Sequence, residues 1–395
     1  MASLLMSPED TMRHFALTLL LCMLTLTGVQ AQTPTGPVLS GSLTTWLVKD
    51  QNSYGIDTRT EYEEWVNRSH LKLGLSFRRP SHTVDLSYQG DVSLYHNQSA
   101  QSNLSHGLNL QAKATHGKYM VFLNGSTSFR RNRSEYDYYN VDSYNARLTV
   151  RYRPDWTLSF NGGLTVSHDD YRGFEELDNV TYTLFANARR SFQSRWSLLG
   201  QTALTLKKYP NQTVTSDPTS GPGGVSRTKE EPVEAALFRV HGSVARSISD
   251  KTGLSVELGG QWFLGSPIET FIDSTYYYTE NDIYDDAHSY QAEYVGARLT
   301  RQFTVSFVAK LSARIAWKSY TGTPALDETG ALAGETREDR RSEASLFLSK
   351  DFQFELIGPT RLGVYTNFTF RDNTSNDPYH DFDDNTFALG VSLKF

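Results

Sequence analysis

The chain lacks the features that mark disulfide-stabilised secreted domains and helical membrane proteins. Its 395 residues include one cysteine, Cys22, and 38% are hydrophobic, with a mean hydropathy of -0.47. After residue 31 no run approaches the roughly 20 apolar residues that a membrane-spanning helix requires. A bundle of transmembrane helices is therefore excluded, and the chain beyond Cys22 can form neither disulfides nor thiolate metal sites.

Motifs for catalysis are also missing. The chain contains no G-x-S-x-G, no H-E-x-x-H and no Gly-rich phosphate loop. His168-Asp169-Asp170 is the one local candidate, and no serine partner accompanies it. The acidic stretches 285–286 and 381–384 lack the spacing and the glycine of an EF-hand, so they indicate solvated loop charge. We predict no enzyme activity, no cofactor and no metal site.

What the chain does contain is long, regular alternation of apolar and polar residues. The segment Trp156–His168 reads WTLSFNGGLTVSH, and Val84–Leu94 and Phe303–Trp317 show the same period of two. Segments of about ten residues with this alternation are the signature of a transmembrane β-barrel. Sixteen such segments can be placed, with 14 to 18 open on the pattern alone, and short and long links alternate between them. The predicted fold is an all-β, antiparallel, up-and-down barrel with short periplasmic turns and long extracellular loops.

The chain ends in a further amphipathic segment, DDNTFALGVSLKF. One face of it carries large apolar side chains, namely Phe387, Leu389, Val391, Leu393 and Phe395. This segment resembles the last strand of bacterial outer-membrane proteins of the porin-like type, which typically ends in Phe. The resemblance implies that these five residues form a signal for membrane insertion, read by the outer-membrane insertion machinery.

The N-terminus predicts export. An apolar run, Phe15–Gly28, follows Arg13 and precedes a small-x-small site at residues 29–31. This arrangement is typical of a cleaved secretory signal peptide. We predict a signal peptide over residues 1–31, a short periplasmic linker over residues 32–39 and a barrel over residues 40–395. The predicted location is the outer membrane of a Gram-negative cell.

If the apolar face of each strand meets lipid, the polar face lines the lumen. The predicted basic residues of this lining are Lys72, Lys113, Arg147, Arg151, Arg189, Arg239, Lys310 and Arg314. The predicted acidic residues are Asp85, Asp91, Glu257 and Glu293. Other acids, Glu64 and Asp384 among them, fall in or beside the long links, while aromatic residues at strand ends, such as Trp46 and Trp317, predict girdles at the membrane interfaces.

A basic wall inside a tube of low dielectric constant concentrates anions. The sequence therefore favours a porin-like channel for the diffusion of small anionic solutes or oligosaccharides. The alternative is a structural or export barrel that anchors or passes a surface polymer within an envelope complex. Expected partners are outer-membrane lipid, lipopolysaccharide and the insertion machinery. A homo-oligomer is compatible with the pattern, and nucleic acid is not an expected partner.

Overall fold

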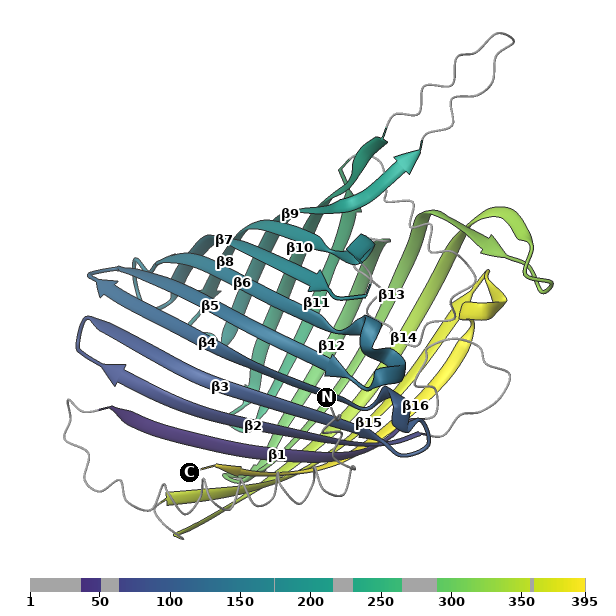
Figure 1. The fold of residues 1–395 in the computed structure, drawn as a ribbon. Helices are drawn as coiled ribbons and strands as arrows, with labels where there is room; N and C mark the ends of the chain where they lie inside the picture. The colour runs from purple at the N-terminus through teal and green to yellow at the C-terminus, as the bar shows by residue number, and fades with distance from the viewer. Residues whose placement is uncertain are drawn as a thin grey trace, which may run out of the picture.

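The computed structural model describes residues 37–50, 64–173, 175–215, 230–264, 290–355 and 359–394. These residues form sixteen strands in one closed barrel (Figure 1). The strands are β1 (Val38–Asp50), β2 (Glu64–Arg78), β3 (His82–Tyr95), β4 (Asn103–His116), β5 (Tyr119–Asn132), β6 (Val141–Tyr152), β7 (Leu158–Tyr171), β8 (Asn179–Ser191), β9 (Trp196–Thr215), β10 (Glu230–Ser249), β11 (Thr252–Phe263), β12 (Gln291–Thr304), β13 (Phe307–Leu326), β14 (Leu332–Glu355), β15 (Pro359–Ser375) and β16 (Phe382–Lys394). Four short 3-10 helices lie in the links: η1 (Ser99–Gln101), η2 (Ser134–Tyr139), η3 (Glu175–Leu177) and η4 (Pro378–His380).

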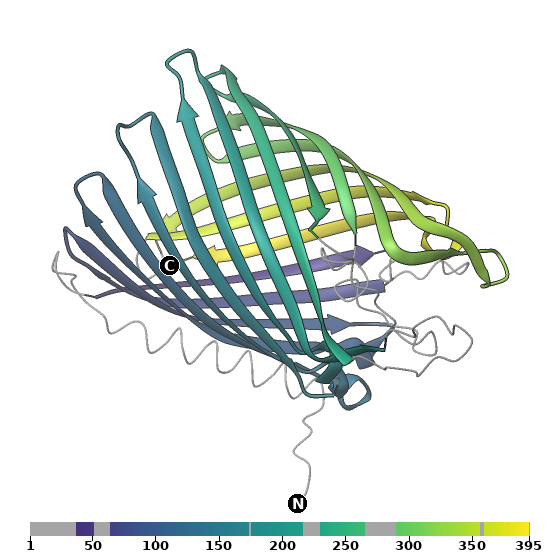
Figure 2. The ribbon, with the colours of Figure 1, turned by 90° about the horizontal axis from the view of Figure 1, so that it is seen from above.

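Every strand pairs antiparallel with its sequence neighbours, and the ring closes where β1 meets β16 (Figure 2). This last pairing runs from Ser42 opposite Lys394 to Asp50 opposite Thr386, the shortest paired stretch of the sixteen among the described residues. The predicted all-β antiparallel barrel and its sixteen strands are confirmed. In the part of the chain that the structure describes, no helix has the length and apolar character to cross a bilayer.

The two ends of the barrel differ. At one end the links are tight turns, such as the corner at Gly117, whose φ of 57° suits a residue without a side chain. The other end, called here the long-loop end, carries η1 to η4 and two hairpins, β9–β10 and β13–β14, that project beyond the rim (Figure 1).

The β13–β14 hairpin stands where the alternation of short and long links predicts one of the long links. The strands continue to Leu326 and restart at Leu332, and a five-residue turn joins them. Asp327 closes this turn, because its side chain accepts hydrogen bonds from the backbone N–H groups of Thr329 and Ala331 at 2.8 and 3.0 Å. Gly330 adopts φ 80° in the same turn. Turn chemistry of the Asp-x-x-Gly kind thus replaces the loop.

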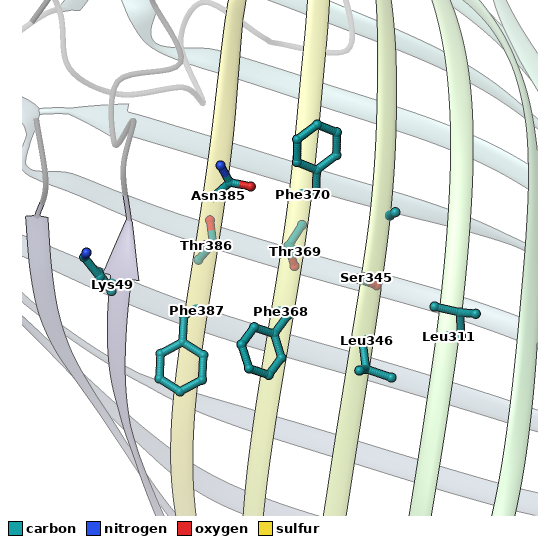
Figure 3. Close-up of a pocket in the computed structure, with 11 residues that line it drawn as sticks. Lys49, Leu311, Ser345, Leu346, Phe368, Thr369, Phe370, Asn385, Thr386 and Phe387 are labelled. Atoms are coloured by element: carbon teal, nitrogen blue, oxygen red, sulfur yellow. The ribbon is translucent and has the colours of Figure 1, made fainter. Parts of the chain in front are cut away.

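The outer face of the barrel is apolar. Alternate residues of each strand expose large apolar side chains, for example Leu108 and Leu110 on β4 and Val256 and Leu258 on β11. Figure 3 shows the same face on β13 to β16, where Phe368 and Phe387 point away from the opposite wall and line a groove of about 340 Å³. Their rings lie 4.9 Å apart, centroid to centroid. Such a face suits lipid, whereas the intervening polar residues face the lumen.

One aromatic residue departs from the predicted girdle. The ring of Trp46 lies inside the barrel, where a Cβ added to Gly390 would come within 2.5 Å of it. Tyr365 lies 5.7 Å away, centroid to centroid, and Val48 and Val66 form a small buried cluster beside Trp46. The interfacial prediction for Trp46 is therefore wrong: Trp46 packs on a glycine in the lumen. Trp317, by contrast, is 48% exposed on the outer face.

The predictions for the chain termini fall partly outside the described residues. The signal peptide, residues 1–31, and most of the linker, residues 32–39, are not described, and β1 begins at Val38. Phe395 also lies outside the described residues. Leu389 and Val391 are 43% and 40% exposed on the outer face of β16. The insertion signal itself stays a prediction.

Candidate functional site: the lumen wall

The predicted lumen residues are spread around the barrel and do not form one cluster. Each predicted basic residue alternates with the exposed apolar residues of its own strand. By strand they are Lys72 on β2, Lys113 on β4, Arg147 and Arg151 on β6, Arg189 on β8, Arg239 on β10, and Lys310 and Arg314 on β13. Among the predicted acids, Asp85 lies opposite Gln111, and Asp91 lies opposite His70 with Oδ1 2.6 Å from Nδ1. Their contribution to function stays a prediction.

Arginine side chains on β6 pack on aromatic rings of β8, across β7, and of the neighbouring strand β5. The guanidinium of Arg147 lies 4.2 Å from the ring centroid of Phe185, and that of Arg151 lies 5.0 Å from the centroid of Phe122. Arg151 also donates from Nε to Asn161 Oδ1 at 2.6 Å. Cation–π contact and hydrogen bonds hold these cations against the wall, so they are not freely extended into the lumen.

Glu293 is a correction to the predicted lining. On β12 the exposed outer residues are Val295 and Leu299, which share the face of Glu293. Glu293 lies in register with Trp317, itself exposed on the outer face. The predicted register of this strand was wrong by one residue, and a slip of one residue exchanges the two faces. The same error concealed Arg298, which belongs to the lumen face.

A lateral row of charges crosses the lumen wall from β11 to β16. Six residues lie in direct register across these strands, and we refer to them as the charged row: Glu257, Gly296, Arg314, Glu343, Arg371 and Asp384. Acid and base alternate along the row, apart from the glycine. Directly opposed residues of an antiparallel pair have their Cβ atoms about 5 Å apart, so the charges are neighbours.

Arg371 is the centre of this row. Its Nη1 lies 3.2 Å from Asp384 Oδ2, and its Nε lies 3.6 Å from Glu343 Oε2. The side chain of Asp384 is only 2% exposed. The interpretation of Asp384 as solvated loop charge is therefore wrong. Sequence reasoning missed Glu343 altogether, because nothing within β14 indicates which residue of β15 lies opposite.

These acids change the electrostatics of the wall. On β13 to β16 the acids Asp339, Glu343 and Asp384 share the inward face with the bases, and each lies in register with a cation. Paired charges concentrate small anions less than the same number of unpaired bases would. These acids therefore weaken the premise of an anion-focusing lumen over these strands.

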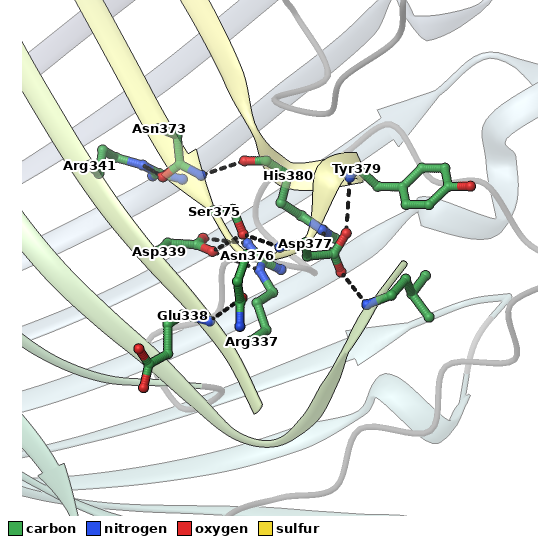
Figure 4. Close-up of polar contacts among 11 residues, drawn as sticks. Arg337, Glu338, Asp339, Arg341, Asn373, Ser375, Asn376, Asp377, Tyr379 and His380 are labelled. Carbon is green, nitrogen blue, oxygen red and sulfur yellow. Dashed lines mark hydrogen bonds and ion pairs between the residues drawn. The ribbon is translucent and has the colours of Figure 1, made fainter. Parts of the chain in front are cut away.

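Above the row, at the long-loop end, a second polar cluster joins β14 to β15 (Figure 4). Arg337 donates from Nε and Nη2 to the two oxygens of Asp339 at 3.0 and 2.6 Å, and Ser375 Oγ donates to the same carboxylate at 2.7 Å. The guanidinium lies 3.9 Å from the ring centroid of Tyr320. Asp339 has no exposed side-chain surface, so this pair is fully desolvated.

Asp377 ties the link that contains η4 to the β13–β14 hairpin. Its carboxylate accepts hydrogen bonds from the backbone N–H of Tyr379 at 2.9 Å and of Leu326 at 3.3 Å, and His380 Nδ1 lies 3.3 Å away. Burial acts to raise the pKa of Asp377, but the His380 imidazole and the two N–H donors outweigh burial and hold that pKa below its ordinary value.

Glu64 and His168 complete the placement of the predicted residues. Glu64, taken as a loop acid, is 1% exposed and accepts hydrogen bonds from the backbone N–H groups of His96 and Asn97 at 2.8 and 3.0 Å. His168 Nδ1 lies 3.1 Å from the carbonyl oxygen of Asn179. Within the described residues no group of three or more His, Cys, Asp or Glu side chains is arranged to hold a metal ion. Asp285 and Asp286 lie outside those residues.

Comparison with solved structures agrees with the barrel fold. CdiB from Acinetobacter baumannii matches with a TM-score of 0.51 and 13% sequence identity, over 93% of this chain and 61% of CdiB. The chain described here is itself an outer-membrane β-barrel. OpdK, an outer-membrane protein from Pseudomonas aeruginosa, matches with a TM-score of 0.48 and 12% identity, over 91% of this chain and 99% of OpdK. At these identities the likeness shows the fold alone, and the chain spans about three fifths of the length of CdiB.

The family comparison corrects the functional prediction. Residues 260–395 match the model of a family described as surface lipoprotein assembly modifier. No curated protein matches the chain. The matched segment contains β12 to β16, and with them the charged row from Gly296 to Asp384. A porin-like diffusion channel was therefore the wrong prediction, and the alternative, an export barrel, agrees better with this match.

The charged row generates a prediction about stability. Arg371→Gln leaves Asp384 buried without its cation, and we expect a loss of about 2 kcal/mol, less than the ~3–5 kcal/mol of a fully buried pair, because Arg371 is 31% exposed. The measurement is chemical unfolding of the barrel in lipid vesicles. Adding Asp384→Asn to Arg371→Gln is expected to restore most of the loss.

The matched control for this prediction is the more exposed pair of Arg361 with Asp351, whose side chains are 51% and 18% exposed. Arg361→Gln is therefore expected to cost below about 1 kcal/mol. Equal losses for Arg371→Gln and Arg361→Gln would contradict the assignment of Arg371 as the centre of the row.

Asp377 generates a prediction about pH. Since its pKa is lower in the folded protein than in the unfolded chain, the carboxylate stabilises the fold above the unfolded value of about 3.9, and that contribution is lost as the pH falls through the folded-state value. We expect amide hydrogen exchange at Tyr379 and Leu326, corrected for intrinsic rates, to lose protection as the pH falls below about 4. Asp377→Asn is expected to show low protection at neutral pH already. Protection in Asp377→Asn equal to that of the unsubstituted protein would argue against this role.

Proposed function

We propose that this barrel takes part in the export of lipoproteins to the cell surface. The observation that carries the proposal is the match of residues 260–395 to the surface lipoprotein assembly modifier family. This role is non-enzymatic: the cargo is a polypeptide that must cross or leave the outer membrane, and the barrel supplies the wall along which it moves.

The lumen wall supports a polypeptide cargo better than a small ion. A polypeptide presents charges of both signs together with backbone donors and acceptors, and the charged row offers acids and bases in alternation. Cations stacked on rings, such as Arg314 at 3.8 Å from the ring centroid of Tyr294, add flat amphipathic surface. Such a wall makes many weak contacts with a polypeptide, and weak contacts let the polypeptide pass rather than stay bound.

The remaining expectations about the cell belong to this proposal. A cleaved signal peptide over residues 1–31 would deliver the chain to the periplasm, and the terminal segment 387–395 would present it to the insertion machinery. Lipopolysaccharide and lipid would contact the apolar outer face. A homo-oligomer stays compatible with the barrel.

The test is the surface display of lipoproteins in cells with and without this protein. Intact cells are labelled with a membrane-impermeant biotin reagent, and labelled lipoproteins are identified by mass spectrometry. We expect a subset of lipoproteins to lose labelling in the deletion strain while their total amount in the outer membrane is unchanged, and complementation to restore it. An identical set of labelled lipoproteins in both strains would refute the proposal.

A further inference from the structure

A small pocket opens in the lumen wall at the one gap in the charged row. Its volume is about 140 Å³, and its polar lining consists of Ser255, Glu257, Arg298, Ser312, Arg314 and Glu343. A water molecule occupies about 30 Å³ in the liquid. The pocket therefore admits one small polar group rather than a folded segment.

The pocket lies where Gly296 leaves the charged row without a side chain. Gly296 lies in register between Glu257 on β11 and Arg314 on β13. A Cβ at this position would lie 3.0 Å from Oε1 and 3.1 Å from Cγ of Glu257. The side chain of Glu257 thus leans over the glycine, and any larger residue would crowd it and narrow the pocket.

Arg298 forms no ion pair within the described residues, although Glu257 and Glu343 line the same pocket and balance its two cations in number. It lies opposite Ser255 on one side and Ser312 on the other, so hydroxyl groups flank it on both strands. In the described part of the chain no carboxylate lies within ion-pair distance of Arg298 or of Arg314, whose guanidinium stacks on Tyr294. Glu343, across the pocket, contacts Arg371 instead.

The hydrogen-bond donors and the size of the pocket select its ligand. Two guanidinium groups and two serine hydroxyls can donate to one carboxylate, and hydrogen bonds between ionised groups are the strong ones. Glu257 and Glu343 at the edges repel a ligand that carries several negative charges, such as a phosphate chain. A single carboxylate on an otherwise neutral or basic segment fits both conditions.

We propose that this pocket is a subsite for one Asp or Glu side chain of the exported polypeptide, with Arg298 as its main contact. The inference rests on the proposed export function for the identity of the ligand. The subsite gives the wall one position that holds an acidic side chain more tightly than the rest of the row does.

The test is the binding of a labelled peptide to the purified barrel in lipid nanodiscs. The probe is a 12-residue Gly/Ser peptide that contains one glutamate, measured by fluorescence anisotropy beside the same peptide with a glutamine at that position. We expect Arg298→Gln to weaken binding of the glutamate peptide about tenfold, the loss of one charge-assisted hydrogen bond. Gly296→Ala, which changes no charge, is expected to weaken it as well by narrowing the pocket.

Arg301→Gln is the matched control, because Arg301 lies on the same strand but on the outer face, where it donates to Thr252. The control is expected to leave binding unchanged. Equal effects of Arg298→Gln and Arg301→Gln, or no effect of Arg298→Gln and Gly296→Ala in folded barrels, would overturn the subsite. Heat-modifiable migration in gels confirms folding, and Gly296→Ala supplies the test if Arg298→Gln does not fold.

The two proposals fail separately. If Arg298→Gln leaves peptide binding unchanged while lipoproteins still need the barrel for surface display, the subsite is refuted and the export proposal stands. If Arg298→Gln weakens peptide binding but surface display of lipoproteins does not depend on the barrel, the export proposal is refuted and a carboxylate-binding site remains.

Discussion

Closure of the backbone hydrogen-bond ring is the constraint on which the rest of this structure depends. In lipid no water can satisfy an exposed N–H or C=O group, so a sheet must have no free edge. The pairing of β1 with β16 removes both edges at once. Once the ring is closed, strict alternation assigns each residue to lipid or to the lumen, and the low overall hydropathy follows because half of every strand is polar.

Closure also places charged residues that are far apart in the sequence side by side on the wall. Arg371 and Asp384 are far from Glu257 along the chain, yet the antiparallel register sets them in one lateral row. Their mutual contacts reduce the cost of placing charge on a barrel wall, and Gly296 interrupts the row. The pocket at Arg298 is thus a consequence of register and of one missing side chain, rather than of a local motif.

Strand positions could be predicted from the sequence because alternation is a local property. The alternating segment Val84–Leu94, for example, lies within the observed strand β3, His82–Tyr95. The site could not be predicted to the same extent, because register and burial are properties of pairs of strands. Glu293 changed face through a shift of one residue, and Glu64 and Asp384 looked like loop acids until their partners were known. The polar faces of the strands suggested a basic lumen and a porin, and the family match corrected the porin prediction.

We propose the lumen wall of β11 to β16 as the path of an exported polypeptide. The most direct measurement is photo-crosslinking in living cells from two adjacent positions on β14. Ser345 faces the lumen and is hydrogen-bonded to Ser312, while Leu346 is exposed on the outer face. With a photoreactive amino acid at each position in turn, the account predicts lipoprotein adducts from position 345 and none from position 346. No adduct from position 345, or equal adducts from both positions, would contradict it.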